Sequence, residues 1–269
     1  MSDEFVRTGT LMDTKSYPVW AQEMIHDCFA SKQAVVQHEF YRKMRDAELT
    51  ERQTRDFLVG GFPVIEQFPQ YMAMNLLKLQ YGKSKGHDMA RKYLIRNIRI
   101  EQNHADYWVE WAELSGVSQQ ELIYGTVPTP SHALSHWCWH TCDRDTLAAA
   151  MAATNYAIEG ATGEWSSVIC ANDTYENLFA PNVRKKAMKW LKLHAEYDDK
   201  HPWEALEIIC TIMGNNPTAR GIHLLGSCIR KSYDYMALTL DHALESRDMK
   251  ETRYSPSYLM EHWERRRAA

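Results

Sequence analysis

The chain has 269 residues, of which 45% are hydrophobic and 25% charged, so it is long enough to bury a substantial core in one helical domain spanning residues 1–269. The net charge is −4 and like charges form no long block, since the arginine-rich stretch at 265–267 is short, which argues against a nucleic-acid partner. The first residues show no basic-then-apolar signal pattern and no apolar run is long enough to cross a bilayer, so we expect a cytoplasmic protein without a membrane span.

Helix-forming patterns dominate the chain, and alternating β-branched stretches between turn residues are almost absent, so an all-α fold is expected. Capping boxes, in which side chains bind the first free amides of a helix, begin at Thr50 and Ser118. Pro181, Pro217 and Pro256 each suit the first position of a helix, where a missing N–H costs nothing. The expected helices span residues 17–46, 50–81, 87–115, 131–141, 143–172, 181–213, 217–247 and 256–267.

The six cysteines are expected to be ordinary buried thiols rather than a disulfide framework. Cys138 and Cys142 lie one helical turn apart, but no second cysteine pair accompanies them, so a structural zinc site is disfavoured. The 13 methionines and nine tryptophans supply bulky apolar surface, which suits either a long hydrophobic pocket or a helical core.

Two acid-x-x-His pairs occur in the first half of the chain. Glu23 and His26 fit an amphipathic surface helix. Glu101 and His104 have a different setting, between the apolar residues of 94–98 and two tryptophans, so the face that carries them is expected to be buried. Side chains three residues apart on a helix can meet on one metal ion, as in helix-bundle di-iron sites.

His132, His136 and His140 form a row at four-residue intervals that could also hold a metal. No carboxylate joins this row before Asp143, so solvated histidines are the expected state.

A nearly uncharged segment rich in small residues, 156–165, contains two glutamates that could bridge metals. The helix is expected to be buried almost all round, and its periodicity therefore does not choose between Glu159 and Glu164.

His194, Asp198 and His201 lie within about 60° of one another around a helix axis, so all three can point inward from one face of one helix. Glu196 and Asp199 fall on the opposite side and are poor ligand candidates. Pro202 follows directly and is expected to kink this helix.

Carboxylate and imidazole ligands without a thiolate suit iron or manganese better than structural zinc, and iron is the metal we expect. Three histidines and three carboxylates against two Fe²⁺ ions leave a net charge of about +1, which an anionic substrate would neutralise. Six protein ligands leave coordination positions open for O₂ and a substrate.

Long stretches of the chain resemble the heme-oxygenase-like di-iron oxidase superfamily, and within it the medium-chain fatty-acid decarboxylases that form 1-undecene. The resemblance is carried by RNIR (96–99), EQNHADYW (101–108), LSHWCWH (134–140), ATNYAIEGATGEW (153–165), AMKWLK (187–192) and HPWE (201–204). It implies a single heme-oxygenase-like (TenA/PqqC-like) helical bundle, and it implies Glu159 rather than Glu164 as the bridging carboxylate. The iron ligands that it implies are Glu101, His104, Glu159, His194, Asp198 and His201.

The same resemblance implies a reaction in which a medium-chain fatty acid such as dodecanoate is converted with Fe(II) and O₂ into a terminal alkene and CO₂. Two Fe(II) ions are implied, of which the second could be held weakly, together with an electron donor of unknown identity. No catalytic residue is expected beyond the metal ligands. Trp165 and Trp190 are candidates for the wall of the substrate pocket, although core packing is the commoner role of such residues. The sequence leaves a homodimer open as the oligomeric state.

Other functions share this scaffold. A sister di-iron oxidase that acts on an amine or an amino acid would keep every ligand and differ in the pocket. A thiaminase-like hydrolase would instead need a nucleophilic cysteine with an acid beside it. A module that merely holds lipid would not need six convergent ligands, whose burial without metal is destabilising.

Overall fold

The structure is a computed structural model that describes residues 4–197 and 200–246. Within these ranges the chain forms helices and no β-strand, which confirms the all-α prediction. The predicted helix 256–267 lies outside the described residues. The helices in chain order are η1 (Thr14–Ser16), α1 (Val19–Val36), α2 (Glu39–Arg45), α3 (Glu51–Leu77), α4 (Lys85–Glu101), α5 (His104–Leu114), α6 (Gln119–Tyr124), α7 (Thr129–Arg144), α8 (Leu147–Met151), η2 (Ala152–Ile158), α9 (Glu159–Ile169), η3 (Glu176–Leu178), α10 (Pro181–Ala187), α11 (Lys189–Tyr197), α12 (His201–Met213) and α13 (Ala219–Glu245).

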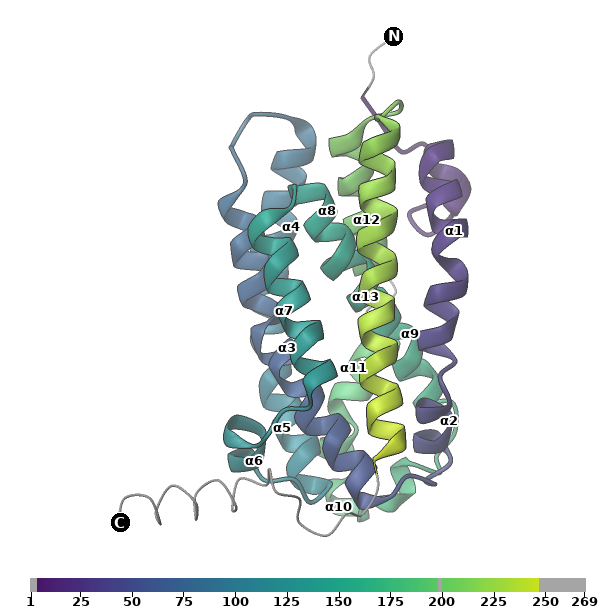
Figure 1. The fold of residues 1–269 in the computed structure, drawn as a ribbon, viewed down its shortest axis with the longest axis vertical. Helices are drawn as coiled ribbons and strands as arrows, with labels where there is room; N and C mark the ends of the chain where they lie inside the picture. Colours follow the sequence, from purple (N-terminus) through teal and green to yellow (C-terminus); the bar gives the residue numbers. More distant parts are fainter. Residues whose placement is uncertain (1–3, 198–199, 247–269) are drawn as a thin grey trace, which may run out of the picture.

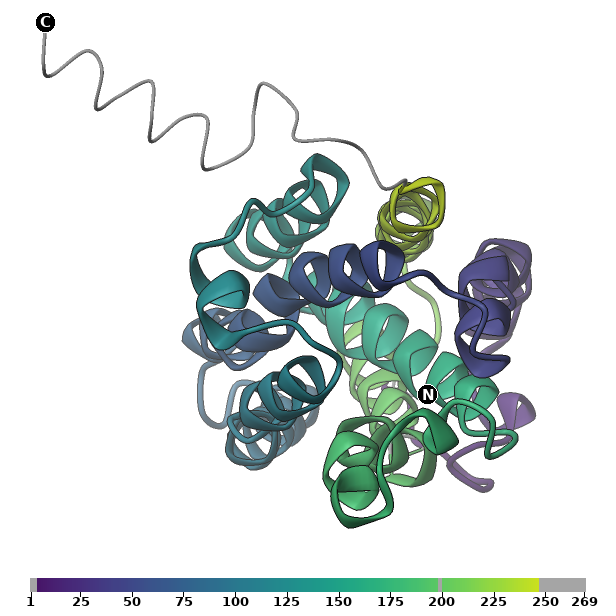
Figure 2. The same ribbon diagram turned by 90° about the horizontal axis from the view of Figure 1, so that it is seen from below.

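The long helices α1, α3, α4, α7, α12 and α13 run roughly along the long axis of the molecule (Figure 1). The segment formed by α8, η2 and α9 passes between them, as the view from below shows (Figure 2). It packs against α1, α2, α7, α11, α12 and α13, and nearly all of its residues are buried. The prediction that this segment is buried almost all round is therefore confirmed.

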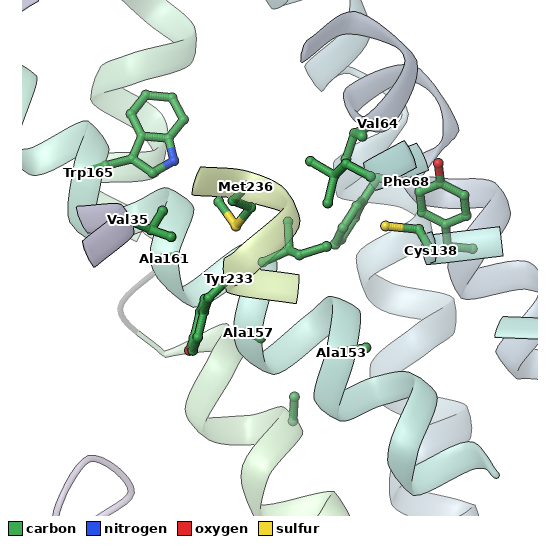
Figure 3. Packing of buried hydrophobic residues seen from close by; sticks show 14 of the residues in the cluster. Val35, Val64, Phe68, Cys138, Ala153, Ala157, Ala161, Trp165, Tyr233 and Met236 are labelled. Atoms are coloured by element: carbon green, nitrogen blue, oxygen red, sulfur yellow. The ribbon is translucent and has the colours of Figure 1, made fainter. Parts of the chain in front are cut away.

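Small side chains let other helices approach this central segment closely. Ala153, Ala157 and Ala161 form a row that is surrounded by apolar side chains of neighbouring helices (Figure 3). The hydroxyl of Ser232 on α13 donates to the carbonyl of Ala153 at 2.9 Å, a contact that needs the two backbones to be close. The row of small residues therefore determines how tightly the bundle closes around its centre.

Several helix starts follow the sequence predictions. Both capping boxes are present, with Thr50 capping α3 and Ser118 capping α6, and Pro181 is the first residue of α10. Pro217 is not the first residue of a helix, because the side chain of Thr218 caps α13 and the helix begins after it.

Three of the expected long helices, 17–46, 87–115 and 181–213, are divided. In the first, the side chain of His38 accepts a hydrogen bond from the amide of Phe40, which starts α2 after α1 has ended. Polar side chains that bind free backbone amides favour a new helix start over continuation. The second helix divides between the predicted ligands Glu101 and His104, and the third divides at Met188 and again between α11 and α12.

The boundary expected between the helices 131–141 and 143–172 lies a few residues later in the structure. The hydroxyl of Thr146 accepts from the amide of Ala149 and starts α8 after α7 has ended at Arg144.

None of the described helices is both long and apolar enough to span a membrane.

Candidate metal centre

Glu101 and His104 face each other across the junction of α4 and α5. Nδ1 of His104 lies 2.7 Å from Oε2 of Glu101, and the two residues are only 6% and 5% exposed. The side-chain Nδ2 of Asn103 donates to the carbonyls of Arg99 and Ile100, both at 3.4 Å, and so binds free carbonyls of the last turn of α4. The two side chains are together as predicted, but they do not share one continuous helix, because Glu101 ends α4 and His104 begins α5.

Glu159 is the first residue of α9 and follows directly on the π-helix η2. Its carboxylate is buried and accepts hydrogen bonds at Oε2 from the hydroxyl of Tyr93 and from Nδ2 of Asn155, both at 3.4 Å. Nδ1 of His201 lies 3.1 Å from Oε1. Single π-helical turns within α-helical segments are frequent at functional sites, since the wider turn changes where the following side chains point.

Gly160 allows α9 and α12 to approach each other at this point. A Cβ atom at Gly160 would lie 3.1 Å from Cβ of Pro202, which follows His201 at the start of α12. The missing side chain therefore lets His201 reach the carboxylate of Glu159.

Glu164, the other glutamate of this segment, points away from the centre. It forms an ion pair with Lys32, and its side chain is 44% exposed, whereas Glu159 is 4% exposed. The residue pattern left both glutamates open as candidates, and burial favours Glu159.

His194 and His201 do not lie on one helix, so the prediction of a single helix face is wrong. α11 ends at Tyr197 and α12 begins at His201. Pro202 explains the new start, since it has no backbone N–H to continue a helix and is favoured in the first turn of one. Asp198 lies outside the described residues.

The ring of His194 has the orientation expected of a metal ligand. Its Nδ1 lies 2.8 Å from the carbonyl oxygen of Trp190. A carbonyl oxygen only accepts, so Nδ1 carries the hydrogen and Nε2 of the neutral ring has a lone pair for a metal ion. The ring centroids of His194 and His104 are 4.6 Å apart, which joins His194 to the pair of Glu101 and His104.

The donor atoms suit iron in type, and two pairs of them have the separation expected of two ligands of one metal ion. Two ligands at about 2.1 Å from one metal ion and about 90° apart lie about 3.0 Å from each other. The pairs Glu101–His104 and Glu159–His201 have separations of 2.7 and 3.1 Å. Among the side chains that the structure describes, no three of His, Cys, Asp or Glu converge closely enough to hold one ion, and the set predicted from sequence also includes Asp198.

Sequence reasoning missed a polar stripe on α4. Tyr93, Asn97 and Glu101 follow one another at four-residue intervals and are all buried. Within the described part of the chain, neither polar atom of the Asn97 side chain has a hydrogen-bond partner. A fully buried amide of this kind indicates a water or ligand atom next to it. The four-residue spacing was the signal that could have revealed this stripe.

The histidine row of α7 and the pair at Glu23 and His26 lie at the surface. His132, His136 and His140 are exposed on α7, and the last two border a surface cleft of about 470 Å³ with Asp143. Glu23 and His26 are also exposed, as expected for an amphipathic helix.

Trp165 and Trp190 belong to a packed cluster of rings. They are 4% and 0% exposed, and their centroids are 5.4 Å apart. Trp190 also stacks on His194 at 3.8 Å. Both tryptophans therefore lie in the core next to the candidate metal centre, and their role as a pocket wall stays a prediction.

Burial raises the pKa of all six cysteine thiols. The pKa rises to about 11 for Cys142 and Cys170 and to about 12 for Cys228, and it is also raised for Cys28, Cys138 and Cys210. A nucleophilic cysteine or a thiolate ligand needs the opposite shift. The thiaminase-like hydrolase and the structural zinc site are both disfavoured.

A sequence model of the family of iron-containing redox enzymes matches residues 55–224, which include all six predicted iron ligands. The chain belongs to this family. Because the family consists of iron-containing redox enzymes, the chain is an oxidoreductase.

Among proteins of known name, the chain is 24% identical over 194 residues to the 4-aminobenzoate synthase of Chlamydia pneumoniae, covering 70% of this chain and 81% of that protein. It is 29% identical over 132 residues to the 4-aminobenzoate synthase of Chlamydia muridarum, which covers 47% of this chain and 53% of that protein.

Among solved structures, a TenA homologue from Pseudomonas syringae pv. tomato is 55% identical, with a TM-score of 0.89 over 90% of this chain and 99% of that one. A TenA homologue from Pyrococcus furiosus is 11% identical, with a TM-score of 0.67 over 84% of this chain and 100% of that one. The fold is therefore the heme-oxygenase-like, TenA-type bundle.

Proposed function

We propose that the chain is an O₂-dependent non-heme di-iron oxidase that converts medium-chain saturated fatty acids, such as dodecanoate, into terminal alkenes such as 1-undecene and CO₂. The observation that carries this proposal is the pair of buried Glu–His contacts, Glu101–His104 and Glu159–His201, in a chain of the iron-containing redox family. The choice of fatty acid rests on the sequence resemblance to 1-undecene-forming decarboxylases of the UndA type.

The protein's own residues hold and orient the reacting groups. Iron, when bound, supplies the chemistry with O₂. The carbonyl of Trp190 fixes the ring of His194, and Tyr93 with Asn155 orients the carboxylate of Glu159. The six residues that would hold iron are Glu101, His104, Glu159, His194, Asp198 and His201.

Charge and burial both favour an anionic, apolar substrate. The six ligands leave two Fe²⁺ ions with a net charge of about +1, which a substrate carboxylate neutralises. Trp190 and its neighbouring rings exclude water from the side of His194. We assign Trp165 and Trp190 to the apolar boundary of the substrate site.

The electron balance requires an external donor. Loss of CO₂ together with one hydrogen from C3 of the acid provides two electrons, whereas the reduction of O₂ to water consumes four. The other two electrons must come from a reductant for each turnover.

The experiment that tests this function is headspace gas chromatography of Fe(II)-loaded protein mixed with dodecanoate, a reductant and air. We expect 1-undecene from the wild type and none from His194→Ala. His132→Ala is the matched control, because His132 is exposed on α7, and it should form the alkene at the wild-type rate. If no alkene forms across a series of medium-chain acids, the fatty-acid assignment is wrong.

The second candidate is oxidation of an amine or an amino acid by the same centre, which the similarity to 4-aminobenzoate synthases favours. Mass spectrometry after aerobic incubation of the iron-loaded protein with reductant and a series of amines and amino acids separates the two candidates. Formation of an oxidised product from one of these substrates, without any alkene from fatty acids, supports the second one.

A further inference from the structure

A continuous row of aromatic rings leads away from the candidate metal centre. Trp190 stacks on His194 at 3.8 Å, and Trp111 lies 5.8 Å from Trp190 in a stacked orientation. The ring centroid of Trp108 lies 4.7 Å from that of Trp190 and 5.0 Å from that of Trp111. The indole N–H of Trp111 donates to the hydroxyl of Tyr175 at 2.8 Å. We call Trp190, Trp108, Trp111 and Tyr175 the aromatic relay.

The outer end of the aromatic relay lies just beneath the surface. Tyr175 is 4% exposed, but residues 171–174 before it and Asn177 and Leu178 after it are exposed. Its side chain therefore points inward from a surface segment. A molecule docked on this segment comes close to the relay.

The inner tryptophans lack an acceptor for their indole proton. In the described part of the chain, Nε1 of Trp190 and Nε1 of Trp165 have no hydrogen-bond partner. An oxidised indole at Trp190 therefore keeps its proton, stays strongly oxidising and takes an electron from the next ring.

A second path, through Tyr107, is electrostatically disfavoured. The ring of Tyr107 is 6.3 Å from that of His104 and is half-buried, so it could also connect the centre to the surface. Nζ of Lys189 lies 3.6 Å from the centroid of Tyr107. A cation at this position stabilises the neutral ring and opposes its oxidation.

We propose that the aromatic relay carries single electrons from a one-electron donor at the surface beside Tyr175 to the iron site. This proposal rests on the proposed iron centre. In each step Trp190 would give one electron to the iron site, Trp111 reduces the oxidised Trp190 either directly or through Trp108, and Tyr175 reduces Trp111. The phenolic proton of Tyr175 passes to the hydroxyl of the half-buried Ser115, its hydrogen-bond partner, which passes a proton on to solvent. The donor then returns one electron to Tyr175, and a proton returns through Ser115. The chain ends unchanged and the donor has lost one electron.

The test exposes Fe(II)-loaded protein to O₂ without fatty acid or reductant and locates oxidised residues by peptide mass spectrometry. Under these conditions the missing electrons come from the relay itself. We expect oxidation of Trp111 and Tyr175 in the wild type. Trp111→Phe should lower oxidation of Tyr175 to the level of iron-free protein and increase it at Trp190. Trp111→Tyr, which differs from the phenylalanine variant by one hydroxyl, should restore oxidation of Tyr175.

Trp20→Phe is the control for loss of a buried indole. Like Trp111, Trp20 is buried and donates one hydrogen bond, in its case to the carbonyl of Gly214 at 3.0 Å, but it is not part of the relay. Its oxidation pattern should equal that of the wild type. Equal oxidation of Tyr175 in the two Trp111 variants overturns the relay, because only the tyrosine variant keeps a readily oxidised ring at position 111.

Two further results separate this proposal from the proposed function. If the protein binds iron and the oxidation pattern follows the relay, but no acid yields an alkene, the relay is supported and the fatty-acid assignment is wrong. If the wild type binds no iron, both proposals are overturned.

Discussion

Replacing Glu159 by glutamine separates a metal ligand from a structural carboxylate. Glu159 is 4% exposed, and its carboxylate is bound by Tyr93, Asn155 and His201. Burying a charge costs several kcal/mol, and these partners offset only part of that cost. In iron-free protein, Glu159→Gln should therefore leave the melting temperature unchanged or raise it. In the presence of Fe(II) the variant should lose the stabilisation that the wild type shows.

The size of that stabilisation follows from mass action. A ligand at about one hundred times its dissociation constant stabilises the folded state by about 2.7 kcal/mol. The unfolding entropy is about 2.1 cal/mol/K per residue, so a chain of 269 residues has about 0.56 kcal/mol/K. Saturating Fe(II) should then raise the melting temperature of the wild type by about 5 °C.

The assay is anaerobic differential scanning fluorimetry with and without Fe(II), combined with measurement of bound iron. Glu164→Gln is the matched control on the same helix, because it removes only the ion pair with Lys32, which is worth about 0.2–1 kcal/mol as a surface contact. It should keep the whole iron-induced shift. An equal shift in Glu159→Gln and the wild type would refute the placement of Glu159 at the metal.

Three further predictions concern packing, thiol chemistry and a helix cap. A Cβ atom at Gly61 would lie 2.7 Å from the ring of Trp108, so Gly61→Ala should lower the unfolding free energy, measured by urea denaturation, by about 1–3 kcal/mol. Gly226→Ala is the control, because only the end of a flexible arginine side chain lies nearby, and it should raise the unfolding free energy by up to about 1 kcal/mol. Burial raises the pKa of Cys170 to about 11, so its alkylation by iodoacetamide should be slow at neutral pH and rise about tenfold per pH unit until the pH approaches this value. A rate that is already at its plateau at pH 8 contradicts this. Thr50→Ala should lower the unfolding free energy by about 0.5–2 kcal/mol by removing the cap of α3, and an unchanged denaturation midpoint would show that the cap contributes nothing.

Local signals in the sequence were enough to predict the helical class and both capping boxes, and they indicated the candidate ligands while leaving the choice between Glu159 and Glu164 open. Capping and helical periodicity depend on neighbours within a few positions. The helix starts at Thr50, Ser118 and Pro181 could therefore be predicted without information about the rest of the fold. The predicted stripe of His194, Asp198 and His201 is not one helix face, because α11 and α12 divide it.

Only the tertiary structure decided which carboxylate faces inward and which segments meet. Glu159 and Glu164 belong to one uncharged segment, and their exposures differ because α12 covers the first while Lys32 of α1 meets the second at the surface. The contact of Glu159 with His201 depends on the close approach that Gly160 allows, and the row of rings beyond His194 joins residues from α5, α11 and the surface segment around Tyr175. Such contacts connect positions far apart in the chain, and a local pattern carries no information about which distant side chain will fill the space beside it.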